Sequence, residues 1–386
     1  MAELPAAPWT RREDLKRLVA VLGADQARYV GGAVRDTLLG IAVKDIDLAT
    51  TIPPRKVMRL LENAGIKPIP TGIDHGTVTA LLPAGPVEIT TLRHDVSTDG
   101  RRATVTFAED WREDAARRDF TINALYADPA TLEISDYFGG LEDLAAHRIR
   151  FIGDARQRIR EDHLRILRYF RFQARFGSQP ADPEAEAAVA ELAATLKALS
   201  RERIGMETMN LLALPDPSPT VSRMAELGVL PVILPEADPQ ALAALAAAEQ
   251  RQGIAPDPLR RLAALLPADP TLAEQVAARF RLSGAQKKRL ATAAGREGHP
   301  GDARALAYRL GRDQTLDRLL LAGADTSALD GWDIPTFPLK GGDIVAQGVK
   351  AGPAVAKALR QVEDRWVAEG FPDAQRVAAI LAEVLP

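Results

Sequence analysis

The sequence predicts an α+β protein, with a mixed N-terminal head followed by a long all-helical part. The chain has 386 residues, which corresponds to two or three domains of about 150 residues each. Up to about residue 145, segments rich in β-branched residues alternate with helical ones. From Glu142 onward Ala, Leu, Glu and Arg dominate, and strand signals become sparse. Because 46% of the residues are hydrophobic and 26% charged, the chain can bury a sizeable core.

Composition excludes several functional classes. The formal net charge of −3 gives no bulk attraction to nucleic acid, so a nucleic-acid partner would need a local basic stripe. The absence of cysteine excludes disulfides, thiolate metal sites and cysteine nucleophiles, and suits a reducing cytoplasm. No apolar segment is long enough to span a membrane, and the N-terminus lacks the pattern of a signal peptide. We therefore expect a cytoplasmic protein without membrane contact.

The head is expected to begin with a helix over Leu15–Leu22, followed by short strands bounded by Pro or Gly. The predicted strands are Ala27–Val30, Ile46–Ala49, Thr77–Leu82 and Val87–Leu92. The polar stretch Asp95–Asp114 is expected to be a mobile hairpin or loop.

Proline-rich segments divide the helical part and are expected to stop helices. They are residues 215–219, 235–239, 256–258 and 267–270. A last segment opens at Phe337, where Asp343 is a plausible N-cap, and Pro353 is well placed to start the amphipathic helix that contains Val355–Trp366.

A glycine pair follows the first predicted strand. Gly31 and Gly32 precede a predicted helix, whose N-terminal N–H groups would suit phosphate oxygens. Arg35, one turn into that helix, would add a charge-assisted bond. The alternative is an ordinary tight turn between a strand and a helix.

Two aspartates flank Ile46 in the next strand. Alternation places Asp45 and Asp47 on one face, where the two carboxylates repel each other unless a cation lies between them. Oxygen ligands without Cys or His indicate Mg²⁺. Glu88 is a candidate third acid, because it lies between apolar neighbours in a later strand. The alternative is that it faces solvent on the exposed face of a half-buried sheet.

Arginine is concentrated in residues 147–176, which hold nine arginines and three acidic residues. This is the electrostatic pattern expected for phosphate binding, whereas a merely solvated helix face would carry mixed signs. A helical wheel places Arg165 and Arg168 opposite the buried side, with Asp162 and Arg171 near its edges. Asp162 and Arg165 would then lie one turn apart on the exposed surface, able to read the edge of a base. The alternative is an ion pair within one helix.

The segment Arg117–Ala124 adds two adjacent arginines before an apolar run. They would meet a triphosphate from one side, or else form a structural salt bridge.

Taken together, these motifs closely resemble class II tRNA nucleotidyltransferases, the CCA-adding enzymes of the polymerase β-like superfamily. The family motifs match Gly31–Asp36, Asp45–Asp47, Arg117–Ala124 and Glu161–Arg165. Residues Asp136–Gly140 with Asp143 resemble the hinge between head and neck, and Ser200–Leu212 resembles the neck helix. The match covers residues 29–212, and Phe337–Val384 resembles the family's C-terminal segment more loosely.

The resemblance implies a polymerase β-like head with a small sheet, followed by an all-helical neck, body and tail in the shape of a hook. The corresponding ranges are 1–145 for the head, 146–214 for the neck, 215–335 for the body and 336–386 for a tRNA-binding tail. It also implies that Asp45 and Asp47 hold Mg²⁺, with Glu88 as the acid of the following strand.

By the same resemblance, the glycine turn (Gly31 and Gly32), Arg35 and Arg118 would bind the triphosphate. Asp162 and Arg165 would select CTP or ATP, supported by Arg168 and Arg171.

The implied activity is addition of C, C and A to the 3′ end of tRNA from CTP and ATP, without a nucleic-acid template and with release of pyrophosphate. The partners are then tRNA and the two nucleotides, with no obligate protein partner. The switch from C to A would need movement of the loop around residues 99–101. Because the five histidines are scattered, we expect no appended phosphohydrolase activity. The alternatives are addition of A alone, a poly(A) polymerase, and a catalytically silent tRNA-binding protein.

Overall fold

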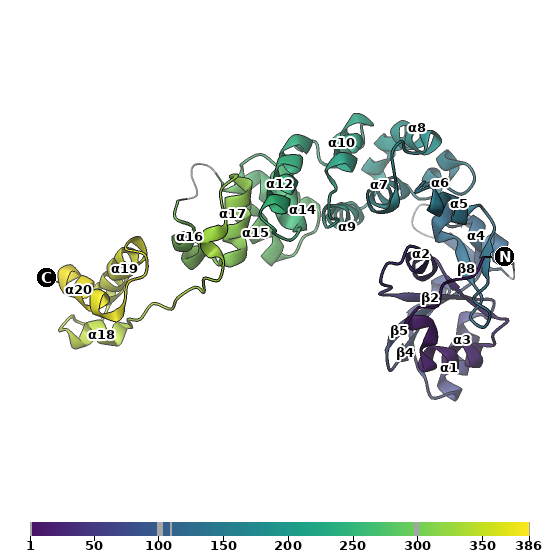
Figure 1. Cartoon of the computed structure of the whole chain (residues 1–386), viewed down its shortest axis with the longest axis horizontal. Helices are drawn as coiled ribbons and strands as arrows, with labels where there is room; N and C mark the ends of the chain where they lie inside the picture. The colour runs from purple at the N-terminus through teal and green to yellow at the C-terminus, as the bar shows by residue number, and fades with distance from the viewer. Residues whose placement is uncertain (1, 99–102, 109, 297–300, 386) are drawn as a thin grey trace. The chain divides into compact units, whose positions relative to one another are not determined.

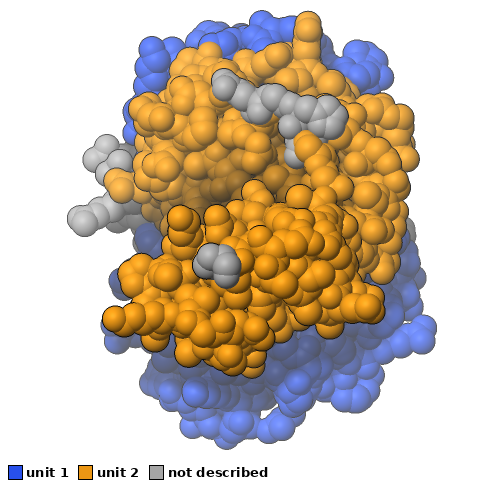
Figure 2. All heavy atoms as spheres, turned by 90° about the vertical axis from the view of Figure 1, so that its left-hand side faces the viewer, with its two compact units in different colours: residues 1–200, 223–233 blue, residues 201–222, 234–386 orange. Residues whose placement is uncertain are grey.

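The computed structural model describes residues 2–98, 103–108, 110–296 and 301–385, and for residues 94–106 only the backbone. The chain forms two compact units, distinguished in Figure 2. The first comprises residues 1–200 and 223–233, and the second residues 201–222 and 234–386.

The first unit contains a seven-stranded sheet in the order β3-β4-β5-β2-β1-β8-β9. Its strands are β1 (Ala27–Val30), β2 (Ile46–Thr50), β3 (Lys67–Gly72), β4 (Thr77–Leu82), β5 (Gly85–Thr91), β8 (Leu125–Ala127) and β9 (Ile134–Asp136). All neighbours are antiparallel except β2 and β5, which are parallel. The mixed fold class and the four predicted strands are confirmed. The sequence prediction missed β3, an edge strand with two prolines, and the three-residue strands β8 and β9.

One face of this sheet is buried, and the opposite face, the open face, is only partly covered, since Ala49 on it is buried. Leu48, Val78 and Ile89 are buried, and α1 (Glu13–Leu22) lies against α3 (Pro54–Asn63), which in turn contacts β3 and β4 (Figure 1). Residues that alternate with these, such as Asp47 and Glu88, lie on the open face. The central strand β2 therefore holds the half-buried Asp47 side chain on this face, between buried neighbours.

The stretch Asp95–Asp114, expected to be a mobile hairpin or loop, contains an antiparallel hairpin of β6 (Arg93–Thr98) and β7 (Ala103–Phe107). It also contains the start of α4 (Trp111–Ala116), a helix not expected from the sequence. The Asp110 side chain caps this helix by accepting from the Arg112 N–H at 2.9 Å. The loop around residues 99–101, expected to move, lies outside the described residues.

The rest of the first unit is helical. It holds α2 (Gly32–Leu38), α5 (Gly140–Ala145), α6 (Ala155–Glu161), α7 (Arg165–Phe176), α8 (Pro183–Leu192) and α11 (Leu230–Ile233). Single-turn 3₁₀ helices are η1 (Trp9–Arg11), η2 (Ile73–His75) and η3 (Thr121–Asn123), and a longer one is η4 (Ala193–Ala198). Helix α10 (Ser218–Glu226) has residues in both units.

The regular elements described in the second unit are all helices. Its helices are α9 (Arg201–Leu212), α12 (Pro239–Arg251), α13 (Pro258–Leu265), α14 (Pro270–Arg279), α15 (Gly284–Ala294), α16 (Ala303–Leu310), α17 (Arg312–Leu321), η5 (Ser327–Leu329), α18 (Gly341–Ala346), α19 (Pro353–Ala368) and α20 (Ala374–Val384). No helix among the described residues is long and apolar enough to cross a membrane.

Several helices of the second unit begin with a proline. Asp238, Asp257 and Asp269 each cap a helix that begins with Pro, so three of the segments expected to stop helices also start the next one. Pro353 starts α19 as predicted. The prediction that Asp343 is an N-cap is wrong: it lies in the first turn of α18, and its carboxylate accepts from the Lys340 N–H at 2.7 Å.

Candidate active site

Asp47 and Glu88 are partners on the parallel strands β2 and β5, so their side chains lie next to each other on the open face. Asp45 immediately precedes β2, two residues from Asp47. Burial, with the nearby Glu88 carboxylate, raises the pKa of Asp47 to about 6, whereas Arg118 opposes this rise and Asp45 adds to it. The structure therefore gathers three acids and one arginine around the centre of the sheet.

The donors at this position fit a divalent cation. A carboxylate whose pKa is raised by a neighbouring carboxylate is stabilised in its charged form by a bound cation. Within the described ranges, no group of three or more His, Asp or Glu side chains is placed so that it could hold a metal ion by itself. A divalent cation at this position would therefore need oxygen ligands from other groups beside one or two carboxylates.

The glycine turn lies beside this acidic group, between β1 and α2. Gly31 has φ +68° and ψ −121°, a conformation that a side chain disfavours. Its N–H donates to the Leu125 carbonyl at 3.1 Å, so this amide is already used within the sheet. Amides for a phosphate would have to come from the residues after it, in the first turn of α2.

Arg118 is held at the same turn. Its Nε and Nη2 donate to the Asp114 carboxylate at 3.3 and 3.1 Å, and Nε also donates to the Tyr126 hydroxyl at 3.1 Å. A Cβ added at Gly31 would lie 3.5 Å from Nη1 of Arg118. The structure thus brings Gly31, Arg118 and Asp47 together, as a site for a triphosphate above a metal-binding pair requires.

Arg35, predicted to contact the triphosphate, is buried with a relative exposure of 6%. Its guanidinium donates to the Asp36 carboxylate and the Asn123 amide oxygen, and it lies 4.2 Å from the ring centroid of Phe176. Burial lowers the pKa of Arg35, and Asp36 counteracts this shift. The contact with Asn123 ties α2 to η3.

Asp119 was not singled out from the sequence, although it follows the two adjacent arginines. It accepts from Arg168 at 2.7 Å and from the Asn123 side-chain amide at 3.0 Å. Burial alone would raise the pKa of Asp119, but Arg168 and Asn123 hold it below its usual value. Together with the contact between Asn123 and Arg35, this forms a continuous polar chain from α7 to α2.

The turn expected to select the base differs from the prediction. Asp162 is not in one helix with Arg165: it ends α6 in an extended conformation, and α7 begins at Arg165. Asp162 accepts from the Leu164 N–H at 3.1 Å. Arg165 is not on an exposed surface, since its side chain is 13% exposed and donates to Glu161 at 2.7 Å and to the Arg117 carbonyl at 3.0 Å. Glu161, rather than Asp162, is thus the acid that fixes the guanidinium.

The arginine-rich segment is also more neutral than its composition suggests. Its arginines form many ion pairs, mostly with acids outside residues 147–176. The fully buried Asp143, for example, pairs with both Arg148 and Arg150. Arg171 lies 5.0 Å from the ring centroid of Phe172. Tertiary partners therefore supply negative charge that the composition of this segment alone does not reveal.

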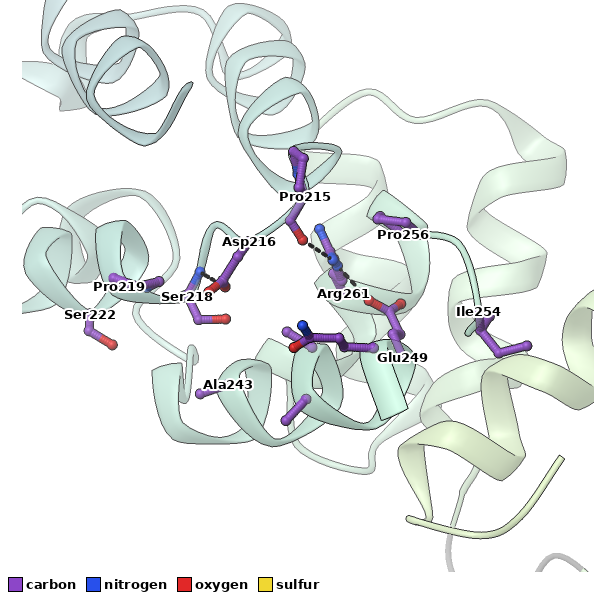
Figure 3. Close-up of a pocket in the computed structure, with 13 residues that line it drawn as sticks. Pro215, Asp216, Ser218, Pro219, Ser222, Ala243, Glu249, Ile254, Pro256 and Arg261 are labelled. Atoms are coloured by element: carbon purple, nitrogen blue, oxygen red, sulfur yellow. Dashed lines mark hydrogen bonds and ion pairs between the residues drawn. The ribbon is translucent and has the colours of Figure 1, made fainter. Parts of the chain in front are cut away.

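A separate pocket of about 650 Å³ lies in the second unit (Figure 3). Its lining includes Ser218, three alanines of α12 and the ion pair between Glu249 and Arg261. Arg261 also donates to the Pro215 carbonyl at 2.8 Å, so its charge is used within the protein. None of the site residues predicted from the sequence lines this pocket.

Two protein families match the chain. The poly A polymerase head domain matches residues 27–150, and the probable RNA- and SrmB-binding site of polymerase A matches residues 181–240. The human mitochondrial CCA tRNA nucleotidyltransferase 1 is 35% identical over 387 aligned residues, which cover 93% of this chain and 87% of the relative. A CCA-adding enzyme of Leuconostoc citreum is 44% identical over 189 residues, covering 48% and 45%.

Solved structures agree with these relatives. The Bacillus stearothermophilus CCA-adding enzyme in complex with CTP has a TM-score of 0.73 at 25% identity, covering 96% of this chain and 98% of that one. The Thermotoga maritima CCA-adding enzyme complexed with tRNA shares the fold, with a TM-score of 0.72 at 20% identity over 99% and 98% of the two chains.

Proposed function

The chain belongs to the family of CCA tRNA nucleotidyltransferases, and we propose that it adds C, C and A to the 3′ end of tRNA from CTP and ATP without a nucleic-acid template. The observation that carries the proposal is the neighbouring position of Asp47 and Glu88 beside Arg118 and the Gly31 turn. Paired acids next to a cationic, glycine-lined turn suit nucleotidyl transfer, which needs positioning and charge stabilisation rather than a protein nucleophile.

We assign the metal ligands to Asp45 and Asp47. Mg²⁺ is the cation we propose there, and when bound it supplies the charge that acidifies the tRNA 3′ hydroxyl and stabilises the departing pyrophosphate. Glu88 stands beside Asp47 on the next strand, where its negative charge strengthens the attraction of the site for a divalent cation.

Arg118 and the amides of Gly32 and the residues after it would bind the triphosphate. The anchored guanidinium of Arg118 presents Nη1 toward the Gly31 turn, which places a fixed positive charge beside the acidic pair. The role of Arg35 would be indirect: it holds α2 against Asn123 and so fixes the amides at the start of that helix.

Selection of the base would rest on Asp162 and Arg165, with Arg168 and Arg171 in support. The carboxylate of Asp162 would accept from the exocyclic amine that cytosine and adenine share, while Arg165 would donate to an acceptor on the ring. The bonds of Arg165 to Glu161 and to the Arg117 carbonyl support the proposal, because a guanidinium held in one orientation discriminates more sharply.

We assign four regions to the chain: a catalytic head (1–145), a neck with the base-selecting turn (146–214), a body (215–335) and a tRNA-binding tail (336–386). We place the reaction in the cytoplasm, which suits a chain without cysteine.

The test is incorporation of single labelled nucleotides into three tRNA transcripts that lack three, two or one residue of the CCA end. The proposal requires CTP to be used on the first two transcripts and ATP on the third, with addition stopping after A. Use of ATP on the third transcript alone would indicate an enzyme that adds only A, and long A tails would indicate a poly(A) polymerase. No incorporation on any transcript would indicate a non-catalytic tRNA-binding protein.

A further inference from the structure

We propose that Tyr126 and Asp114 are positioning residues that hold Arg118 in the orientation needed to bind the triphosphate. The inference rests on the proposed function and adds to it two residues that the sequence motifs did not assign. Neither residue is placed in contact with substrate: both act through Arg118.

Asp114 is an almost completely buried carboxylate, with 1% relative exposure, at which several donors converge. One oxygen accepts from Arg118 and, at 2.7 Å, from the Tyr126 hydroxyl. The other accepts from Arg117 Nε at 3.0 Å and from the Arg93 N–H at 3.4 Å. A buried charge with this many donors is rigidly held, so it is a firm anchor for the guanidinium.

Tyr126 supplies the second anchor. It is fully buried, and its hydroxyl both donates to Asp114 and accepts from Arg118 Nε at 3.1 Å. Its position on β8 is opposite Val30, the residue directly before the Gly31 turn. The sheet register thus fixes the distance between the phenol and the turn where the triphosphate is proposed to bind.

These contacts leave one guanidinium nitrogen of Arg118, Nη1, available to bind a phosphate. Nε and Nη2 of Arg118 face Asp114 and Tyr126, whereas Nη1 has no hydrogen-bond acceptor among the described residues and lies beside Gly31. Arg118 is also close enough to Asp47 to lower the pKa of that carboxyl. Without these anchors, the Arg118 side chain would be attracted to the carboxylates of the acidic pair. It would then neutralise the negative charge that a metal ion needs, and it would no longer contact the phosphates.

Removal of one hydroxyl tests the proposal in the full-length protein. In Tyr126→Phe, we expect the Kd for CTP, measured by titration calorimetry with Mg²⁺, to rise roughly tenfold, because a charge-assisted contact to Arg118 is lost. The Kd for CMP should stay within about twofold, since CMP lacks the β- and γ-phosphates. Tyr137→Phe is the matched control: its hydroxyl accepts from Arg28 at 2.9 Å and its ring packs against Tyr126, but it does not bond Arg118.

A double-mutant cycle separates positioning from general stability. In an Arg118→Ala background, Tyr126→Phe should have no further effect on the Kd for CTP. An equal effect with and without Arg118, or an equal loss of CTP and CMP binding, would overturn the proposal, as would a Tyr126→Phe protein with wild-type affinity for CTP. Failure of the proposed function itself is distinguishable, because the wild-type protein would then fail to extend tRNA whatever the variants do.

Discussion

Asp47 and Glu88 face each other across the only parallel strand pair of the described sheet, with Arg118 close enough to influence the Asp47 carboxyl. The central position of β2 gives this acidic pair a rigid base of buried neighbours, including Ile46 and Leu48. The same sheet carries the glycine turn at the end of β1, so acids and phosphate-binding groups belong to one rigid framework.

The Gly31 turn should tolerate no side chain. Gly31→Ala forces a residue with a Cβ into φ +68°, at a cost of about 1–2 kcal/mol, and should lower kcat/KM at least tenfold. Gly32→Ala is the control for stability, since Gly32 has an ordinary φ and an added Cβ would meet Arg35 only at 3.7 Å. Thermal unfolding should therefore shift for the first variant and hardly at all for the second; equal shifts would show that the turn conformation is unimportant.

Asp162→Ala should relax nucleotide selection. A site built to accept from an exocyclic amine rejects UTP and GTP because they leave its carboxylate unpaired, so its loss should reduce the preference for CTP and ATP by about tenfold or more. The measurement is kcat/KM for all four nucleotides. Glu191→Gln is a suitable control, because Glu191 also pairs with an arginine of this segment, Arg156, outside the base-selecting turn. Unchanged ratios in Asp162→Ala would remove this residue from base selection.

Asp114 should make the first unit sensitive to acid. Burial alone would raise the pKa of Asp114, but Arg118, Arg117 and Tyr126 lower it from 3.8 to about 2. A carboxyl with a lowered pKa in the folded state contributes stability above its unfolded pKa, and that contribution is lost as the pH falls toward 2. Asp114→Asn should therefore cost about 2 kcal/mol or more at pH 7, and the difference from wild type should shrink between pH 4 and 2. A difference independent of pH in that range would contradict the assignment.

Glu249 should stabilise the second unit strongly. It is 2% exposed and accepts from both Arg260 and Arg261, so Glu249→Ala leaves two buried guanidinium groups without this partner and should cost about 3–5 kcal/mol. Asp364→Asn, which breaks an exposed pair with Arg309, should cost less than about 1 kcal/mol. Urea denaturation of the two variants measures the contrast, and similar losses would show that burial does not decide the effect.

The sequence was informative where a single local rule dominates. Hydrophobic alternation located β2 and β5, and glycine before a helix located the turn at Gly31, because these signals depend on residues close in the chain. The edge strand β3 was missed because its two prolines argue against a strand except at the edge of a sheet.

The side-chain partners were less predictable. Arg165 was expected at the surface, but Glu161 and the Arg117 carbonyl enclose it, and the second of these is distant in the sequence. The pairing of Arg168 with Asp119 depends equally on tertiary packing. Helical periodicity assigns a face to a residue, but it does not reveal which acid from another element will meet it there.

The most direct test of the account is incorporation of labelled CTP into tRNA lacking the whole CCA end by the Asp47→Asn protein. Asp25→Asn, at an exposed position before β1, serves as the control. The account predicts a loss of at least a thousandfold in rate for Asp47→Asn, since the charge that holds the metal is removed, with unchanged thermal unfolding and full activity in the control. Extension of the tRNA by Asp47→Asn at a rate close to that of the wild-type protein would contradict it.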